Sequence, residues 1–259
     1  MDDNYSAYLR RIMRSTLPDT YESQVRNVQS SGKFEQTPSG TWMPKAFPGY
    51  TIVTPPGRED PANGPLYERL ASFQQQLLGT LSSQIFIPVP PSSFHLTVAD
   101  LIWSDGFDDA LKSDPDFEQK LCLSVKESFE QSSHLTTNQP ISFRVVGLMV
   151  MTRSLTLALA ATDETGYNQI LELRRSIYQS PRLMSIGIDQ QYHFTPHITL
   201  GYFGDLSTID RSALAIQMDE LNQAWIGSEE TFSLKTAQLR QFPDMSSYER
   251  SDDWASFTF

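Results

Sequence analysis

The spacing of apolar residues along the chain predicts helices that alternate with short strands. Helices are expected where apolar residues recur every three or four positions, and strands where short β-rich runs end in Pro, Gly or polar clusters. Helices are therefore expected at 65–82, 117–129 and 166–180, and along the stripe of Leu214, Met218, Leu221 and Trp225. Strands are expected at 50–54, 93–100, 143–150, 155–160, 194–203 and 231–239. This mixture indicates an α+β fold.

The segments that flank this pattern are more polar. Residues 1–49 contain one helical candidate, Tyr5 to Met13, among loops rich in Ser, Pro and Gly. We expect them to form an N-terminal extension packed on the domain. Residues 50–242 should form the domain itself, and the tail 243–259 should have little regular structure. A hydrophobic content of 39% is that of a globular protein.

A unit of helix, strand and helix occurs twice, around the strands at 93–100 and 194–203. We infer a weak internal duplication, with two α+β lobes related by a pseudo-twofold axis. In the expected architecture, two antiparallel-rich sheets flank a central groove and the helices lie outside.

The two repeated strands carry the same short motif. Phe94-His95-Leu96-Thr97-Val98 and Pro196-His197-Ile198-Thr199-Leu200 each place a histidine two positions before a threonine. Successive side chains of a strand point to opposite faces, so the His and Thr share one face and the aliphatic residues share the other. Two such strands could present two imidazoles and two hydroxyls to one groove.

Composition and charge narrow the possible partners. The net charge of −11 and the pI near 4.8 make the chain a poor candidate for a long nucleic acid duplex, whose phosphates are bound by many Lys and Arg residues. A small anionic ligand needs only a few local donors. The single cysteine, Cys122, allows no internal disulfide and suits a reducing compartment. No signal peptide or apolar membrane span is visible, so we expect a cytoplasmic monomer.

With these two motifs, the sequence resembles the 2H phosphoesterases, also described as LigT-like or 2′-5′ RNA ligase-like proteins. Their signature is a pair of His-hydrophobic-Thr/Ser-hydrophobic motifs, one in each lobe of a duplicated α+β fold. His95-Leu96-Thr97-Val98 and His197-Ile198-Thr199-Leu200 match both copies, and Gly201-Tyr202 is also familiar after the second. The resemblance spans roughly 50–240. It implies metal-independent chemistry on a phosphodiester, often a 2′,3′-cyclic nucleotide end that is opened to a monoester.

The four motif residues suit this chemistry. A base must activate water and an acid must protonate the leaving oxygen, and two histidines near neutral pH can supply one neutral and one charged imidazole. The threonine hydroxyls can stabilise charge on the non-bridging oxygens. We therefore expect His95, Thr97, His197 and Thr199 to be catalytic, without metal or cofactor. Which histidine is the acid stays open at this point.

Further candidates for substrate binding are Tyr202, Arg153 and His193, and Lys33 is a cation that could also contact phosphate. His193 lies four residues before His197, which is the spacing of a helical zinc pair. Pro196 argues against a helix there, so we expect no metal site.

His134-Leu135-Thr136 also matches the His-x-Thr pattern, but it lies in a polar loop without flanking aliphatic residues, so we interpret it as a coincidental match. Two other functions stay open. One is a non-catalytic module that binds a nucleotide or an RNA end, and the other is 2′-5′ RNA ligation. A binding module would not require two proton-transfer groups.

Overall fold

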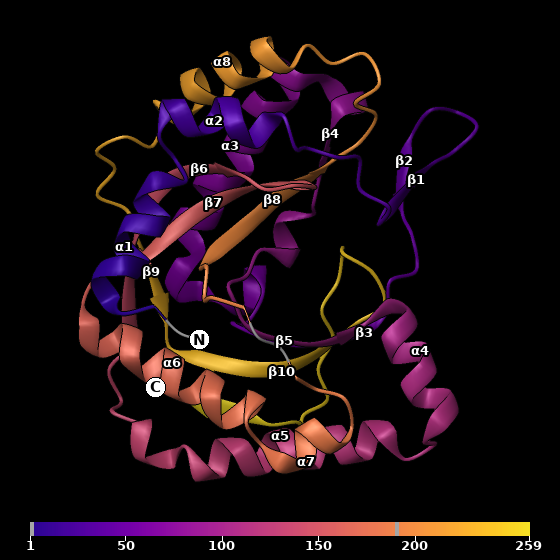
Figure 1. Ribbon diagram of the computed structural model, residues 1–259, viewed down its shortest axis with the longest axis vertical. Helices are drawn as coiled ribbons and strands as arrows, with labels where there is room; N and C mark the ends of the chain where they lie inside the picture. Colours follow the sequence, from indigo (N-terminus) through magenta and orange to yellow (C-terminus); the bar gives the residue numbers. More distant parts are fainter. Residues whose placement is uncertain (1–2, 190–191) are drawn as a thin grey trace.

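Two antiparallel sheets carry the two motifs and lie opposite each other in the computed structural model, which describes residues 3–189 and 192–259 (Figure 1). The first sheet has the strand order β11-β10-β3-β5 and the second has the order β4-β8-β7-β6-β9. Every pair of neighbouring strands in these two sheets is antiparallel, so the predicted α+β fold with two antiparallel-rich sheets is confirmed.

The strands of the first sheet are β3 (Gly49–Val53), β5 (Thr97–Trp103), β10 (Thr236–Phe242) and β11 (Ser256–Thr258). Those of the second sheet are β4 (Phe86–Pro88), β6 (Ile141–Val150), β7 (Ser154–Ala161), β8 (His197–Phe203) and β9 (Thr231–Leu234). A separate hairpin of β1 (Phe34–Gln36) and β2 (Trp42–Pro44) projects from the body of the molecule (Figure 1).

The helices cover the outer faces of the two sheets (Figure 1). On the side of the five-stranded sheet lie α2 (Pro18–Val25), α3 (Gly64–Ile85) and α8 (Arg211–Asn222). On the side of the four-stranded sheet lie α4 (Ser104–Ser113), α5 (Phe117–Gln131), α6 (Glu164–Tyr178) and α7 (Pro181–Ser185). Helix α1 (Tyr5–Arg14) contacts both β7 and α6. Single 3₁₀ turns occupy Gly57–Glu59, Pro61–Asn63, Pro91–Ser93 and Ser133–Leu135.

In each repeat, the helix that precedes the motif packs against the strand that carries the other motif. Helix α3 precedes the first motif along the chain, but it packs on β4 and β8 of the five-stranded sheet. Helix α6 precedes the second motif, yet it contacts β5, which carries the first. Each motif strand is therefore backed in part by the helix that precedes the other motif.

Both motifs alternate in burial as their sequences predict. Leu96, Val98, Ile198 and Leu200 are fully buried in the core, whereas the histidines and threonines between them are half-buried. Burying an aliphatic side chain of this size contributes about 1.5–3 kcal/mol. The core thus fixes the direction in which the polar side chains point. The expected strand starts were too early, since β5 begins at Thr97 and β8 at His197.

The N-terminal residues belong to the main core. Tyr8 and Tyr21 are fully buried, and the Tyr21 hydroxyl donates to the carbonyl of Leu148 in β6 at 2.5 Å. The Tyr8 hydroxyl accepts from the backbone N–H of Ala161 at the end of β7. Buried tyrosines therefore hold α1 and α2 on the five-stranded sheet.

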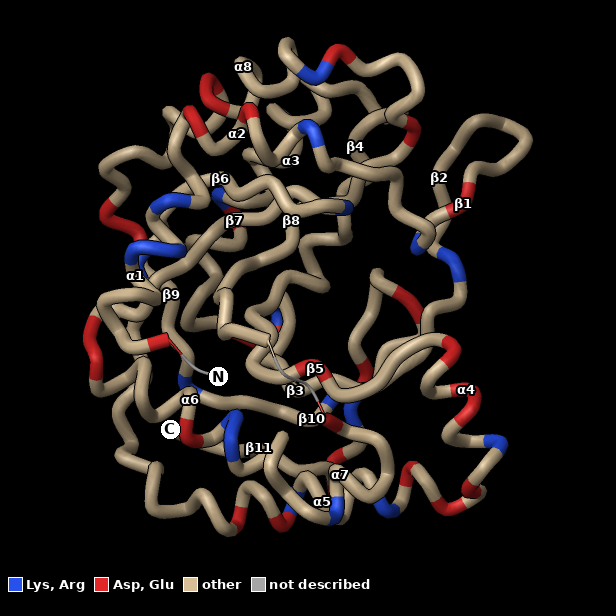
Figure 2. The backbone as a smooth tube through the Cα atoms, viewed as in Figure 1, with Lys and Arg blue, Asp and Glu red and all other residues tan. Residues whose placement is uncertain are grey.

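Acidic residues lie along the outer helices, with several on α4 and α5 (Figure 2). Lys and Arg are scattered along the backbone in the same view. Among the helices of the described residues, none is both long enough and apolar enough to cross a membrane.

Candidate active site

His95 and His197 are held by the same backbone geometry. Nδ1 of His95 lies 2.6 Å from the carbonyl oxygen of Ser93, and Nδ1 of His197 lies 2.7 Å from that of Thr195. A carbonyl can only accept, so each Nδ1 carries the proton and the lone pair of the neutral ring is on Nε2. Both contacts run to the residue two positions earlier, which fixes the two rings in equivalent orientations.

The Nε2 atoms and hydroxyl groups of the two motifs form no hydrogen bonds within the described residues. Within residues 3–189 and 192–259, neither histidine Nε2 and neither hydroxyl of Thr97 and Thr199 has a hydrogen-bond partner in the protein. None of these atoms is sealed from solvent. Two imidazoles and two hydroxyls are therefore available to a ligand.

A small cavity joins the two motifs. It is lined by His95 from the first motif and Thr199 from the second, together with Val89, Ser93, Tyr202, Met245 and Tyr248. Its volume is about 10 Å³, which is near the minimum for one water molecule. The site is therefore assembled but almost filled by its own side chains.

Loss of hydration lowers the pKa of both histidines. The pKa of His95 is lowered to about 4, mainly by burial; the Ser93 carbonyl and Asp100 oppose this, and the charges of His197 and Arg240 add to it. Burial also lowers the pKa of His197, which the Thr195 carbonyl and Asp100 oppose. The influence of His197 on His95 shows that the two rings lie within electrostatic reach of each other.

Asp100 is a member of the site that the sequence reasoning missed. It lies on β5 three residues after Thr97, and its carboxylate accepts from the Tyr192 hydroxyl at 2.8 Å. Its charge raises the pKa of both motif histidines. The available signal was an acidic residue in an otherwise apolar strand, Val98-Ala99-Asp100-Leu101-Ile102.

Arg240 is a second missed residue. It lies on β10 with 3% of its side chain exposed, and it pairs with Glu59 and Gln238. One of its guanidinium nitrogens donates to the backbone carbonyl of Tyr248 at 3.1 Å. The buried arginine thereby ties the C-terminal segment to the sheet beside His95.

The segment 243–248, here called the covering loop, closes the cavity. It begins where the Pro243 carbonyl accepts from the backbone of Phe47, and it ends where Gln241 and Glu249 exchange two backbone hydrogen bonds. Between these points it places Met245 and Tyr248 over the site. The Tyr248 ring packs against the His95 ring in a T-shaped arrangement with the centroids 4.2 Å apart. The sequence did not predict this role, because the tail was expected to have little regular structure.

The three predicted binding residues are placed differently. Tyr202 lines the cavity. Arg153 lies at the turn between β6 and β7, where it is exposed and donates to the Gln29 side chain at 2.9 Å. His193 is half exposed, with Nδ1 3.6 Å from the Asp3 carboxylate. Neither Arg153 nor His193 lines the cavity.

His134 lies away from the motifs, on the outside of the molecule. Its Nε2 is 2.7 Å from the carboxylate of Glu172 on α6, and the ring is largely exposed. That carboxylate raises the pKa of His134. The histidine of the third His-x-Thr match therefore belongs to a surface ion pair and does not line the cavity of His95 and Thr199.

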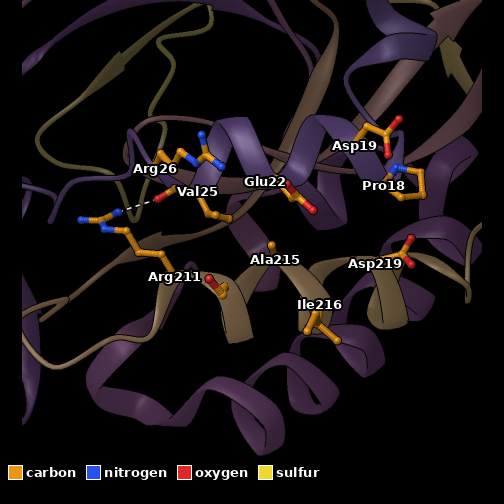
Figure 3. A pocket seen from close by; sticks show the side chains of 10 residues that line it. Pro18, Asp19, Glu22, Val25, Arg26, Arg211, Ala215, Ile216 and Asp219 are labelled. Carbon is orange, nitrogen blue, oxygen red and sulfur yellow. Dashed lines mark hydrogen bonds between the residues drawn. The ribbon is translucent and has the colours of Figure 1, made fainter.

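A larger pocket of about 350 Å³ lies between α2 and α8 (Figure 3). Half of the ten residues that line it are charged, and they are of both signs: Asp19, Glu22, Asp219, Arg26 and Arg211. Arg211 is engaged there with the carbonyl of Val25. These helices cover the outer face of the five-stranded sheet, so we place the chemistry at the smaller cavity, where His95 of the first motif and Thr199 of the second meet.

Within residues 3–189 and 192–259, no group of three or more His, Cys, Asp and Glu side chains is arranged to hold a metal ion.

Comparison with solved structures identifies the fold. The protein ATU0111 of Agrobacterium tumefaciens C58, described as a conserved protein of unknown function, matches 80% of this chain and 86% of its own length, with a TM-score of 0.54 and 16% identity. The chain has the fold of ATU0111. At this identity the likeness concerns fold alone.

Two further structures cover similar parts of the chain at lower TM-scores. E. coli LigT complexed with 3′-AMP matches 83% of this chain and 98% of LigT, with 13% identity and a TM-score of 0.45. The protein TT0787 of Thermus thermophilus matches 81% of this chain and 96% of its own, with 14% identity and a TM-score of 0.44. No protein-family model matches the sequence, and no curated protein matches it.

Proposed function

We propose that this chain is a metal-independent phosphodiesterase that opens a cyclic phosphodiester to a monoester. The substrate is a 2′,3′-cyclic nucleotide, a cyclic-phosphate RNA end or a small cyclic oligonucleotide. The observation that carries the proposal is the matched geometry of His95 and His197. The Nδ1 atoms of both are anchored to a carbonyl, while both Nε2 atoms are free of partners among the described residues. Two proton-transfer groups at one site are what such a reaction requires.

His95 is assigned as the base and His197 as the acid. The pKa of His95 is lowered to about 4, so its Nε2 is unprotonated over most of the pH range and can accept a proton from water. The water oxygen forms a bond to phosphorus, and the bond from phosphorus to one ribose oxygen breaks. Nε2 of the protonated His197 ring donates its proton to that oxygen. Exchange with solvent then restores both rings.

Thr97 and Thr199 supply fixed donors to the phosphate. Negative charge builds on the non-bridging oxygens as water attacks, and a hydroxyl that already points at them stabilises this charge without reorganisation. Both hydroxyls are without a protein partner in the described residues, which leaves them free to donate.

The covering loop must move when substrate binds. A cavity of about 10 Å³ cannot hold a nucleotide, and Met245 and Tyr248 fill the space beside His95. The ends of the loop are held by backbone hydrogen bonds, so displacement of 243–248 is the smallest change that admits a ligand.

The experiment is a screen of 2′,3′-cyclic mononucleotides, cyclic dinucleotides and short cyclic-phosphate RNAs, with products identified by mass. We expect the wild type to give a product heavier than the substrate by one water molecule. His95→Ala and His197→Ala should not form this product. Binding without turnover in the whole panel would instead favour a binding module.

The acid and base roles are separated with a second substrate, a nucleoside p-nitrophenyl phosphate, whose leaving group does not require protonation. His197→Ala should recover much of its lost rate on this substrate, whereas His95→Ala should not. Equal recovery of both variants would contradict the assignment.

A further inference from the structure

Two hydrogen-bond donors converge on one sulfur atom at the edge of the site. Nζ of Lys33 and the hydroxyl oxygen of Tyr202 each lie 3.2 Å from Sδ of Met245. A thioether sulfur is a weak acceptor, whereas an ammonium group and a phenol are strong donors. The Met245 sulfur is therefore a poor acceptor for the two strong donors, Lys33 and Tyr202, that point at it.

The surroundings of Lys33 make this mismatch costly. Its ammonium group lies over the rings of Phe47 and Tyr202, 4.6 and 5.2 Å from their centroids. In the part of the chain that the structure describes, no carboxylate lies within ion-pairing distance of it. Burial lowers the pKa of Lys33, and the charge of Asp100, which lies beyond ion-pairing distance, opposes this. A desolvated cation without a counter-charge is unfavourable unless a ligand supplies one.

Of these three side chains, Met245 is the one that moves away when the covering loop is displaced. Met245 belongs to the covering loop, which has to move for a nucleotide to enter, and it lines the cavity with His95 and Thr199. Lys33 and Tyr202 are not on this loop. When the loop is displaced, two donors remain, facing the space next to the reacting phosphate.

We propose that the position of the Met245 sulfur is an anion subsite, in which Lys33 and the Tyr202 hydroxyl bind a second phosphate of the substrate. This inference rests on the proposed function and narrows its substrate class. The substrate is then a cyclic phosphodiester with a further phosphate beside the ring, such as a 5′-phosphorylated 2′,3′-cyclic nucleotide or the cyclic-phosphate end of an oligonucleotide. A nucleoside 2′,3′-cyclic phosphate without this group leaves Lys33 unpaired.

The chain offers a matched control for Lys33. The backbone N–H of Lys45 donates to the Lys33 carbonyl, so the two lysines are neighbours, but the Lys45 side chain is exposed. Lys33→Met keeps the length of the side chain in its apolar surroundings and removes the charge. Lys33→Arg keeps the charge, and Lys45→Met removes a nearby charge outside the subsite.

The first measurement is the ratio of kcat/KM for a 2′,3′-cyclic nucleotide with and without a 5′-phosphate. The wild type and Lys45→Met should prefer the phosphorylated compound by about 10–100-fold, as expected for a hydrogen-bonded charge pair. In Lys33→Met the ratio should fall to near one, mainly through KM, and Lys33→Arg should restore part of it. An unchanged ratio in Lys33→Met overturns the subsite.

The second measurement keeps the two proposals distinguishable. Inorganic pyrophosphate is titrated into each variant by calorimetry, and the Lys33 ammonium is followed by NMR. Weaker binding to Lys33→Met than to Lys45→Met, with a rise in the pKa of Lys33 as the anion binds, supports the subsite even if no cyclic phosphate is hydrolysed. Equal binding of pyrophosphate by Lys33→Met and Lys45→Met overturns the subsite. It does not bear on the proposed hydrolysis, which the substrate screen tests.

Discussion

The rings of Tyr248 and His95 pack in a T-shaped arrangement, with centroids 4.2 Å apart and the planes at 62°. Desolvation is the main reason that the pKa of His95 is lowered to about 4, and Tyr248 is a large part of what covers this ring. Removing the ring in Tyr248→Ala should therefore raise the pKa of His95 toward its ordinary value of about 6.5. NMR titration of the histidine ring signals measures this change.

Tyr248→Phe is the matched control, because it keeps the ring over His95 and removes only the hydroxyl. It should leave the pKa of His95 close to that of the wild type. If the pKa of His95 is also unchanged in Tyr248→Ala, then the Tyr248 ring does not exclude water from His95.

The pH dependence of turnover should lie on the acid side of neutrality. The base must be neutral and the acid protonated, and burial lowers the pKa of both histidines. The plot of kcat/KM should be bell-shaped, with an acid limb near the His95 pKa of about 4 and a second limb below about 6.5. Bound phosphate favours the imidazolium, so the limbs of kcat should lie at higher pH. A rate that rises steadily from acid to alkaline pH would contradict two-histidine catalysis.

Substitutions of the motif residues should have graded effects. His95→Ala or His197→Ala should lower kcat by about 10²–10⁴-fold, because each removes a proton-transfer group. Thr97→Val or Thr199→Val keeps the shape of the strand and removes one donor, so the loss should be about 10–10³-fold. The double histidine variant should lose much less than the product of the single losses, since the pair acts as one unit.

His134→Ala is the control for these substitutions, because His134 pairs with Glu172 on the outside of the molecule. Its turnover should stay within a few-fold of wild type, and circular dichroism should show that every variant is folded. Loss of activity in His134→Ala together with retention in His95→Ala would reverse the assignment of the first motif.

Chelation should leave turnover intact. The proposed acid, base and donors are all side chains, so exhaustive treatment with EDTA should not lower kcat/KM. Loss of activity that added zinc or manganese restores would contradict the proposed mechanism.

Folding stability should also depend on the two histidines. Unfolded histidines bind protons with a pKa of about 6.5, whereas both motif histidines have a lower pKa in the folded chain. As the pH falls below about 6.5 the unfolded state gains protons that the folded state does not, so the free energy of unfolding falls. For His95 this loss continues to about pH 4.

Urea denaturation at about pH 7 and about pH 5 measures the effect. The His95→Gln/His197→Gln variant should lose less stability between these pH values than the wild type does. An equal loss would show that other groups account for the pH dependence.

The sequence was most informative where one physical rule governs several residues. Alternation with period 2 placed Leu96 and Ile198 in the core and left the neighbouring histidines half-buried on the other face of each strand. Helices with a long apolar stripe were also predicted, such as α3 with Leu70, Phe73 and Leu77 on its buried face.

Elements with few buried positions were missed. Helix α2 buries only Tyr21 and Val25, and α4 buries only Phe107, so neither shows a repeating stripe. The expected strand at 231–239 is divided, because β9 and β10 join different sheets on either side of Lys235. Local pattern does not tell to which sheet a strand belongs.

The rest of the site could not be predicted because it depends on contacts between distant parts of the chain. Tyr248 meets His95 across about 150 residues of sequence, and Lys33 meets Met245 across 212. No local spacing signals either contact.

The pairing of β3 with β10 has a consequence for synthesis. Residues 49–53 form the centre of the four-stranded sheet, but their partner strand is residues 236–242, near the other end of the sequence. Pairings between such distant segments form late, and a growing chain cannot form this one until residue 242 has left the ribosome. Until then β3 has no β10 beside it and His95 has no Tyr248 packed against it. A nascent chain would therefore expose the edge of β3 until β10 has emerged, and we expect chaperones that recognise unpaired strands to bind it during this interval.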